Sequence, residues 1–170
     1  AVEHMAELGV DHLVVFPLYP QYAQSSTETS ILESKRIAAR VLPSATVDVV
    51  PPFFDDEEVI KAYAAQGRKI LDEFQPDHVL FSFHGLPERH IFKSDNSRQH
   101  CLKSEHCCAQ MVAANSRCYR AQSFQSARRI AAELSLTQSQ WSTSFQSRLG
   151  RSKWIEPYTL ARKLIRCGRA

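Results

Sequence analysis

The sequence predicts an α/β fold in which a parallel sheet is flanked by helices and interrupted by a cysteine-rich insertion. Short apolar runs of strand length alternate with longer segments whose apolar residues recur at helical spacing. The runs are apolar on both faces, which is typical of parallel strands that helices cover and that right-handed crossovers connect. This alternation stops between residues 95 and 120, where four of the five cysteines lie.

The composition is typical of a soluble globular protein, with 44% apolar and 23% charged residues. A chain of 170 residues is long enough for one domain or for part of a larger protein. The net charge of +3 is modest and spread along the chain, so we expect no nucleic-acid partner. No run approaches the roughly 20 apolar residues that are needed to span a bilayer.

The first part of the chain is expected to contain the end of a helix, a strand, a second helix and a second strand. His12–Tyr19 is a continuous apolar run of strand length. The Ser/Thr-rich segment after it can cap a helix from about Ile31 to Leu42. Val47–Phe54 has the composition of a strand that ends at two prolines.

The remainder is expected to contain two more strands and three helices. The acidic residues 55–58 favour a helix start, and apolar residues then recur at helical spacing as far as Phe74, just before Pro76. The other predicted elements are strands at Asp77–Phe83 and Trp141–Phe145, a helix at Phe124–Leu134 and a closing helix from Pro157.

His84 follows directly on a predicted strand and precedes Gly85, Leu86 and Pro87. In parallel α/β sheets, ligands bind beyond the carboxyl ends of the strands, which is where His84 would lie. A glycine allows the chain to turn there, and Pro87 stiffens the segment that follows. His84 is therefore a candidate ligand or base, the alternative being a histidine that only caps the strand end.

Four cysteines occupy the segment from residue 95 to residue 120, which is too long for an ordinary connection: Cys101, Cys107, Cys108 and Cys118. Four thiolates can bind a tetrahedral ion or a [2Fe–2S] cluster, and His100 or His106 could replace one of them. The spacing does not fit the paired knuckles of a zinc ribbon. Disulfides and free thiols remain alternatives, and Cys167 is expected to be a core residue.

A third candidate region runs from Ser144 to Thr159. Gln146 and Ser147 follow a predicted strand and so share the edge of His84, and Arg148 adds positive charge close to Trp154. Such a set suits a flat apolar ligand that carries carboxylates, through stacking and charge-assisted hydrogen bonds. The alternative is a basic loop with an anchoring tryptophan. Tyr19 and Tyr22 could likewise line a cleft or fill one.

Three segments in this order, PLYPQYAQSST, FSFHGLPERHIFKSD and SFQSRLGRSKWIEPYT, resemble the ferrochelatases. That family inserts ferrous iron into protoporphyrin IX in the last step of haem synthesis. The resemblance implies a chelatase-like fold of two Rossmann-like halves with a porphyrin cleft between them. It covers the chain outside the cysteine-rich loop.

The resemblance also implies roles for individual residues. His84 resembles the family histidine that takes part in metal delivery or in removal of porphyrin protons, and Tyr19 resembles a tyrosine on the opposite wall. Trp154 resembles a tryptophan near the porphyrin, beside which the substrate-binding candidates Tyr22, Gln146, Ser147 and Arg148 are expected. Some members hold a [2Fe–2S] cluster in one internal segment, and the ligands here would be Cys101, Cys107, Cys108 and Cys118.

By the same resemblance, residues 1–23 would end the first half, residues 24–46 would form a crossover helix, and residues 47–170 would form an incomplete second half with a cluster loop at 95–120. The family's Asp-Pro-Tyr is replaced by Asp95-Asn96-Ser97. A family glutamate would lie beyond Ala170, and most of the N-terminal half would precede Ala1. We therefore expect a fragment that is nearly inactive alone.

Two other functions remain open. One is a [2Fe–2S] redox or sensor module without chelatase activity, and the other is a cobalt chelatase that acts on another tetrapyrrole. The absence of a recognisable secretory signal leads us to expect a cytoplasmic location, with peripheral contact at the inner membrane left open. The sequence assigns no oligomeric state.

Overall fold

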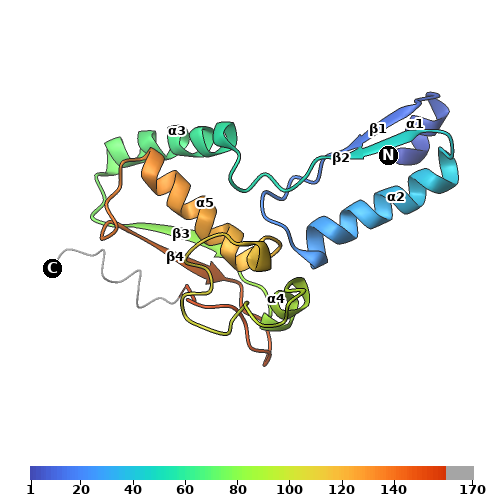
Figure 1. Cartoon of the computed structure of the whole chain (residues 1–170). Helices are drawn as coiled ribbons and strands as arrows, with labels where there is room; N and C mark the ends of the chain where they lie inside the picture. Colours follow the sequence, from blue (N-terminus) through green and yellow to red (C-terminus); the bar gives the residue numbers. More distant parts are fainter. Residues whose placement is uncertain (160–170) are drawn as a thin grey trace. The chain divides into compact units, whose positions relative to one another are not determined.

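The structure, a computed structural model, describes residues 1–159 of the chain. The chain divides into two compact units, one from Ala1 to Phe53 and one from Phe54 onward. Each unit contains one two-stranded parallel sheet with helices beside it (Figure 1).

The first unit is built from a parallel strand pair and two helices. Its elements are α1 (Val2–Glu7), β1 (His12–Val15), a π-helical turn η1 (Gln24–Glu28), α2 (Thr29–Val41) and β2 (Thr46–Val49). Leu13 on β1 pairs with Val47 on β2 and is buried. Its neighbour Val14 points to the other face and is 56% exposed, so the described residues cover only one face of this sheet.

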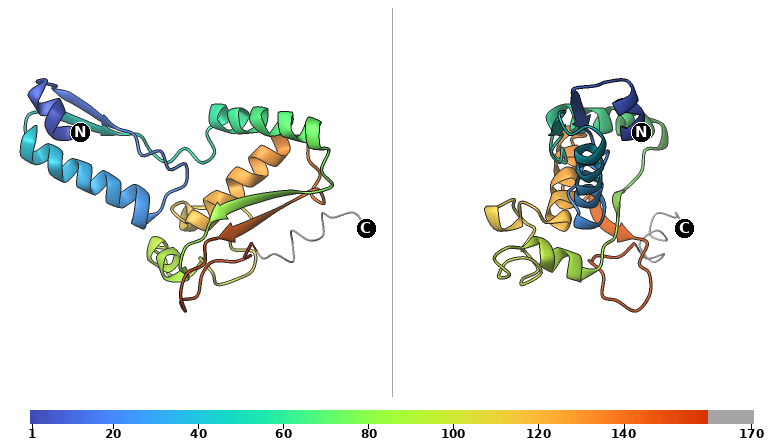
Figure 2. Two further views of the ribbon diagram at one scale, coloured as in Figure 1. Left: turned by 180° about the vertical axis from the view of Figure 1, so that it is seen from behind. Right: turned by 90° about the vertical axis from the view of Figure 1, so that its right-hand side faces the viewer.

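The second unit carries the candidate site. Its elements are α3 (Glu57–Phe74), β3 (Val79–His84), α4 (Glu88–Ser94), a 3₁₀ turn η2 (Ala113–Asn115), α5 (Tyr119–Glu133) and β4 (Trp141–Gln146). The parallel pair β3–β4 runs from Val79 opposite Trp141 to His84 opposite Gln146. Helices α3 and α5 pack together on one side of this pair (Figures 1 and 2).

The core of the second unit joins the sheet to the cysteine loop. The aromatic ring of Phe145 is 2% exposed and lies 5.9 Å from the ring of Phe124 on α5. All four cysteines of the loop belong to the same buried cluster, together with Ile91 of α4 and Ile155. The loop is therefore part of the hydrophobic core of this unit and does not lie only on its surface.

The alternation of strands and helices is confirmed, with three corrections. The strand predicted to extend to Tyr19 ends at Val15, before Pro17, which has no N–H to donate to a sheet. Helix α5 begins at Tyr119, five residues before the predicted start. Its first turns bury the polar residues Gln122 and Ser123, so no apolar pattern marks this part of the helix. Helix α4 was not expected.

Strand pairing differs from the expectation of one sheet, because the four described strands form two separate pairs. Strand β2, which was expected to open the second half at residue 47, pairs with β1 inside the first unit. The assignment of these segments to two halves of a larger fold stays a prediction.

The closing helix predicted from Pro157 is not present over residues 157–159, where Tyr158 instead bridges to Phe145 in parallel. The rest of that predicted helix, including Cys167, lies outside the described residues. Between residues 1 and 159, no helix has both the length and the apolar character needed to cross a membrane.

Candidate functional site

His84 is the last residue of β3, and its side chain is exposed. Its Nδ1 lies 2.7 Å from the carbonyl oxygen of Gly85. A carbonyl only accepts hydrogen bonds, so this contact assigns the proton of the neutral ring to Nδ1. Nε2 then carries the free lone pair. This neutral tautomer can bind a metal ion or accept a proton through Nε2.

Gly85 brings the strand end into close contact with β4. Its N–H donates to the carbonyl oxygen of Gln146 at 2.7 Å. A Cβ at this position would meet the same oxygen at 2.7 Å and the indole of Trp154 at 3.2 Å. Only glycine fits without displacing one of these two neighbours, which explains its place after His84.

Hydrogen bonds join the turn after His84 to the segment that contains Trp154. The N–H of Ile155 donates to the carbonyl of Leu86 at 3.0 Å, and the N–H of Glu88 donates to the carbonyl of Lys153 at 2.9 Å. These contacts hold the half-buried Trp154 ring 6.5 Å from the His84 ring. Two motifs about 70 positions apart in the sequence therefore form one edge of the unit.

Gln146, Ser147 and Arg148 are all exposed at this edge. Ser147 has a positive φ of 68°, which turns the chain sharply after β4. Arg148 lies over the ring of Tyr158 at 5.0 Å, a cation–π contact that leaves its guanidinium at the surface. The structure thus brings His84 and Trp154 together, with Gln146 opposite His84 on the neighbouring strand.

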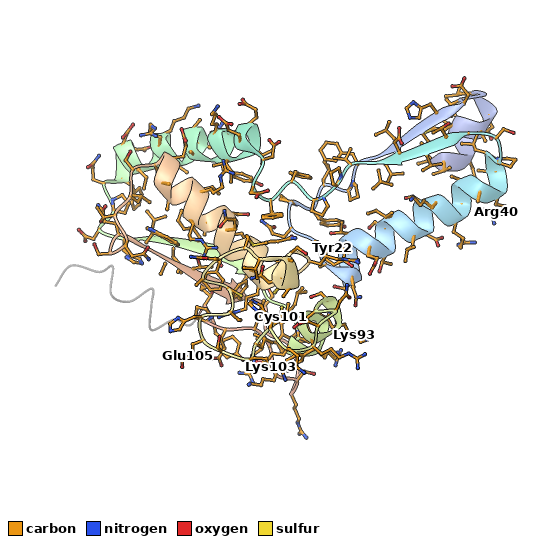
Figure 3. The ribbon with its side chains drawn as sticks, viewed as in Figure 1. Tyr22, Arg40, Lys93, Cys101, Lys103 and Glu105 are labelled. Atoms are coloured by element: carbon orange, nitrogen blue, oxygen red, sulfur yellow. The ribbon has the colours of Figure 1, made fainter. Side chains whose placement is uncertain are left out.

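The two candidate tyrosines belong to the first unit. Tyr19 is 46% exposed and follows β1, whereas Tyr22 is only 7% exposed (labelled in Figure 3). The side chain of Tyr19 is available to a ligand, and that of Tyr22 is largely covered. Their role in a shared cleft stays a prediction.

The four loop cysteines are buried thiols without disulfides. The sulfurs of Cys107 and Cys108 lie 3.7 Å apart, and Cys118 forms hydrogen bonds with Cys101 and Cys108. Cys101 lies within the folded loop, whereas Lys103 is exposed at its surface (Figure 3). Positions separated by up to 17 residues therefore converge on one cluster of sulfurs.

Burial and hydrogen bonding raise the pKa of three of these thiols, Cys107, Cys108 and Cys118. The hydrogen bond to Cys101, together with burial, raises the pKa of Cys118 to about 12. The hydrogen bond that Cys108 donates to Cys118, together with burial, raises the pKa of Cys108 even further, and burial raises the pKa of Cys107. Because metal ions bind thiolates, iron binding here would release protons.

Two charged residues, Arg120 and Asp95, for which the sequence pattern predicted no role, organise the loop. Arg120 donates from Nη1 to the sulfur of Cys108 at 3.1 Å and also lies 3.8 Å from that of Cys107. In the sequence, this contact was indicated only by the position of Arg120, two residues after Cys118. Asp95 was noted only as a departure from a family motif, although the Asp-x-Ser pattern is typical of a side chain that caps a turn.

The buried carboxylate of Asp95 receives five hydrogen bonds at the start of the loop. Oδ1 accepts from the N–H and hydroxyl of Ser97 and from the N–H of Arg98, and Oδ2 accepts from the N–H groups of His100 and Cys101 at 3.0 and 2.8 Å. The Ser97 hydroxyl is the largest cause that holds the pKa of Asp95 far below its usual range. The carboxylate thereby fixes the backbone that carries Cys101.

The fit of a two-iron cluster to the cysteine loop stays a prediction. Within residues 1–159, no group of three or more His, Cys, Asp or Glu side chains is arranged to hold one metal ion. A [2Fe–2S] cluster, in contrast, is held by four cysteine sulfurs distributed over two irons. The loop supplies four buried sulfurs, which is the number of ligands that such a cluster needs, and the N–H of Leu102 donates to the sulfur of Cys107 at 3.3 Å.

Comparison with protein families decides the relationship. Residues 1–166 match the family model described as Ferrochelatase. The chain belongs to the ferrochelatase family. Among curated ferrochelatases, that of Ectopseudomonas mendocina (strain ymp) is 46% identical over 162 residues, which are 95% of this chain and 47% of the relative.

Two further ferrochelatases give the same result. That of Pseudomonas fluorescens (strain Pf0-1) is 46% identical over 91% of this chain and 45% of its own length. That of Pseudomonas syringae pv. tomato (strain ATCC BAA-871 / DC3000) is 47% identical over 93% of this chain and 46% of its own length. The chain thus spans about half the length of the curated ferrochelatases that it matches.

Proposed function

We propose that the protein to which this chain belongs inserts ferrous iron into protoporphyrin IX, the last step of haem synthesis, with His84 at the reacting centre. The observation that carries this proposal is the exposed His84 ring at the end of β3, whose Nδ1 is hydrogen-bonded to Gly85 and whose Nε2 has no hydrogen bond to any of residues 1–159. Membership of the ferrochelatase family supports the reaction class.

Porphyrin metallation needs removal of two pyrrole protons and delivery of one cation. The free Nε2 of His84 has the chemistry for both, because neutral imidazole is a ligand for ferrous iron and a base near neutral pH. It accepts a pyrrole proton or holds the incoming iron, while the Gly85 carbonyl keeps the ring in that tautomer. Iron is here the substrate and not a resident cofactor.

The remaining residues of the edge bind and orient the macrocycle. Trp154 offers an aromatic surface 6.5 Å from the His84 ring, and Arg148 offers a guanidinium for a propionate carboxylate. Gln146 and Ser147 supply polar groups beside them. A cleft that favours a bent macrocycle accelerates insertion, because bending exposes the pyrrole lone pairs.

We propose in addition that Cys101, Cys107, Cys108 and Cys118 hold a [2Fe–2S] cluster. When bound, this cluster stores one electron. The support is four buried sulfurs in one core cluster. The anaerobically purified protein should contain two irons and two sulfides, with visible absorption that Cys118→Ser removes and Cys167→Ser leaves unchanged.

The chelatase assignment is tested by anaerobic metal insertion with the whole protein. We expect ferrous iron to convert protoporphyrin IX to haem, followed as loss of porphyrin fluorescence, and cobalt with sirohydrochlorin to give no product. Product only from the second pair would identify a cobalt chelatase. If neither porphyrin binds while the iron–sulfur absorption persists, the protein is a redox or sensor module.

A further inference from the structure

Arg120, on the first turn of α5, directs its charge at the cysteine cluster. Its Nη1 lies 3.1 Å from the sulfur of Cys108 and 3.8 Å from that of Cys107. Both contacts are hydrogen bonds from a charged side chain to a cysteine sulfur. The contact links a permanent positive charge to two of the four sulfurs.

The guanidinium is held in this position from two other directions. Its Nε donates to the carbonyl of Glu156 at 2.9 Å, and its Cζ lies 4.8 Å from the centre of the Phe124 ring. A backbone carbonyl and an aromatic face orient the group without neutralising its charge. No carboxylate within the described part of the chain forms an ion pair with Arg120.

A cavity of about 210 Å³ lies beside this contact, and Cys108 is the one cysteine that lines it. Arg128 lines it as well and donates to the carbonyl of Cys108 at 3.1 Å. The exposed Glu105 and His106 are the other titratable groups of the lining. Cys108 is therefore the cysteine next to this cavity, and two guanidinium groups flank it.

We propose that Arg120 sets the reduction potential of the cysteine centre by stabilising its reduced state through Cys108 and Cys107. This inference rests on the proposed [2Fe–2S] cluster. Reduction by one electron converts one of two ferric ions to ferrous and adds one negative charge, which the sulfur ligands share. A cation and an N–H donor at two of these sulfurs favour the more negative state and so raise the potential.

The test is an anaerobic redox titration of the whole protein with dithionite, monitored by the visible absorption of the cluster. Arg120→Gln removes the charge, and Arg120→Lys keeps a charge without the planar guanidinium. We expect a lower potential for Arg120→Gln and a smaller decrease for Arg120→Lys. The control is Arg129→Gln, which removes an arginine of the same helix that donates to the Asp55 carbonyl instead of to sulfur.

The outcomes separate this inference from the cluster proposal. If the wild-type protein contains no cluster, the proposed cofactor is wrong and the inference with it. If both Arg120 variants keep two irons and two sulfides but titrate at the wild-type potential, Arg120 does not set the potential. If Arg120→Gln loses the cluster, the reduction potential of the Arg120→Lys protein decides. A potential equal to that of the wild-type protein overturns the inference, and a lower potential supports it.

Discussion

At the scale of single residues, backbone contacts determine what the functional side chains can do. The Gly85 carbonyl assigns the tautomer of His84, and the absence of a side chain at Gly85 lets β4 and Trp154 approach it. In the cysteine loop, Asp95 has the corresponding role, because its carboxylate accepts hydrogen bonds from the N–H groups of His100 and Cys101. The Gly85 carbonyl thus orients the ring of His84, and the Asp95 carboxylate holds the start of the cysteine loop.

Replacement of Asp95 should destabilise the second unit. In Asp95→Ala, five donors lose a charged acceptor, and hydrogen bonds to charged groups contribute about 1.5–3 kcal/mol each at most sites. Because water can reach some of these donors after the change, we expect a decrease of about 3 kcal/mol in the free energy of unfolding, measured by urea denaturation.

Asp72→Ala is the matched control for this measurement, because Asp72 is exposed on α3. It should change the free energy of unfolding by less than about 0.5 kcal/mol. Equal effects of the two substitutions would show that the carboxylate of Asp95 does not organise the loop.

At the scale of elements, the position of a glycine decides whether a side chain is tolerated. Gly67 lies inside α3, where an added Cβ would make ordinary contact with Leu134 at 3.4 Å. Gly85 lies at the end of β3 against the backbone of β4, where an added Cβ would lie 2.7 Å from an oxygen. The same substitution should therefore have opposite effects at the two sites.

Gly67→Ala should raise the free energy of unfolding by about 0.5–1 kcal/mol, because alanine favours the helix and restricts the unfolded chain. Gly85→Ala should lower it by about 1–3 kcal/mol, because β4 or Trp154 must move. Chemical denaturation of both variants checks the pair. A stabilising Gly85→Ala would mean that this close approach is not a constraint.

The start of α3 depends on one cap. Oδ1 of Asp56 accepts from the N–H groups of Glu58 and Val59 at 3.1 Å each. Asp56→Ala should cost about 1 kcal/mol of stability, as is usual for loss of an N-cap, in a thermal or urea melt. Asp55→Ala, which keeps the cap, should cost clearly less, and the reverse order would contradict this assignment.

The sequence pattern predicted those features that depend on local periodicity. The amphipathic spacing identified α3, and an apolar run located the end of β3 and hence His84. Features that depend on long-range contacts were missed. The start of α5 buries polar Gln122 and Ser123, so no apolar pattern marks it. Likewise, the contact of Arg120 with Cys108 depends on how the loop folds back.

At the scale of the whole molecule, the residues with proposed roles are divided between the two compact units. The tyrosines belong to the first unit, whereas His84, Trp154 and the cysteines belong to the second. The chain also spans about half the length of the ferrochelatases that it matches. Activity must therefore be measured on the whole protein, in which every part of the proposed cleft is present.

The most direct measurement is the rate of anaerobic ferrous iron insertion into protoporphyrin IX by the whole protein and its His84→Ala variant, with porphyrin affinity measured in parallel by fluorescence. Loss of a proton acceptor or metal ligand should lower kcat about 100-fold or more, while porphyrin binding changes little. His4→Ala, which alters an exposed histidine of α1, is the control and should retain the wild-type rate. A His84→Ala variant with the wild-type kcat would show that the free Nε2 is not at the reacting centre.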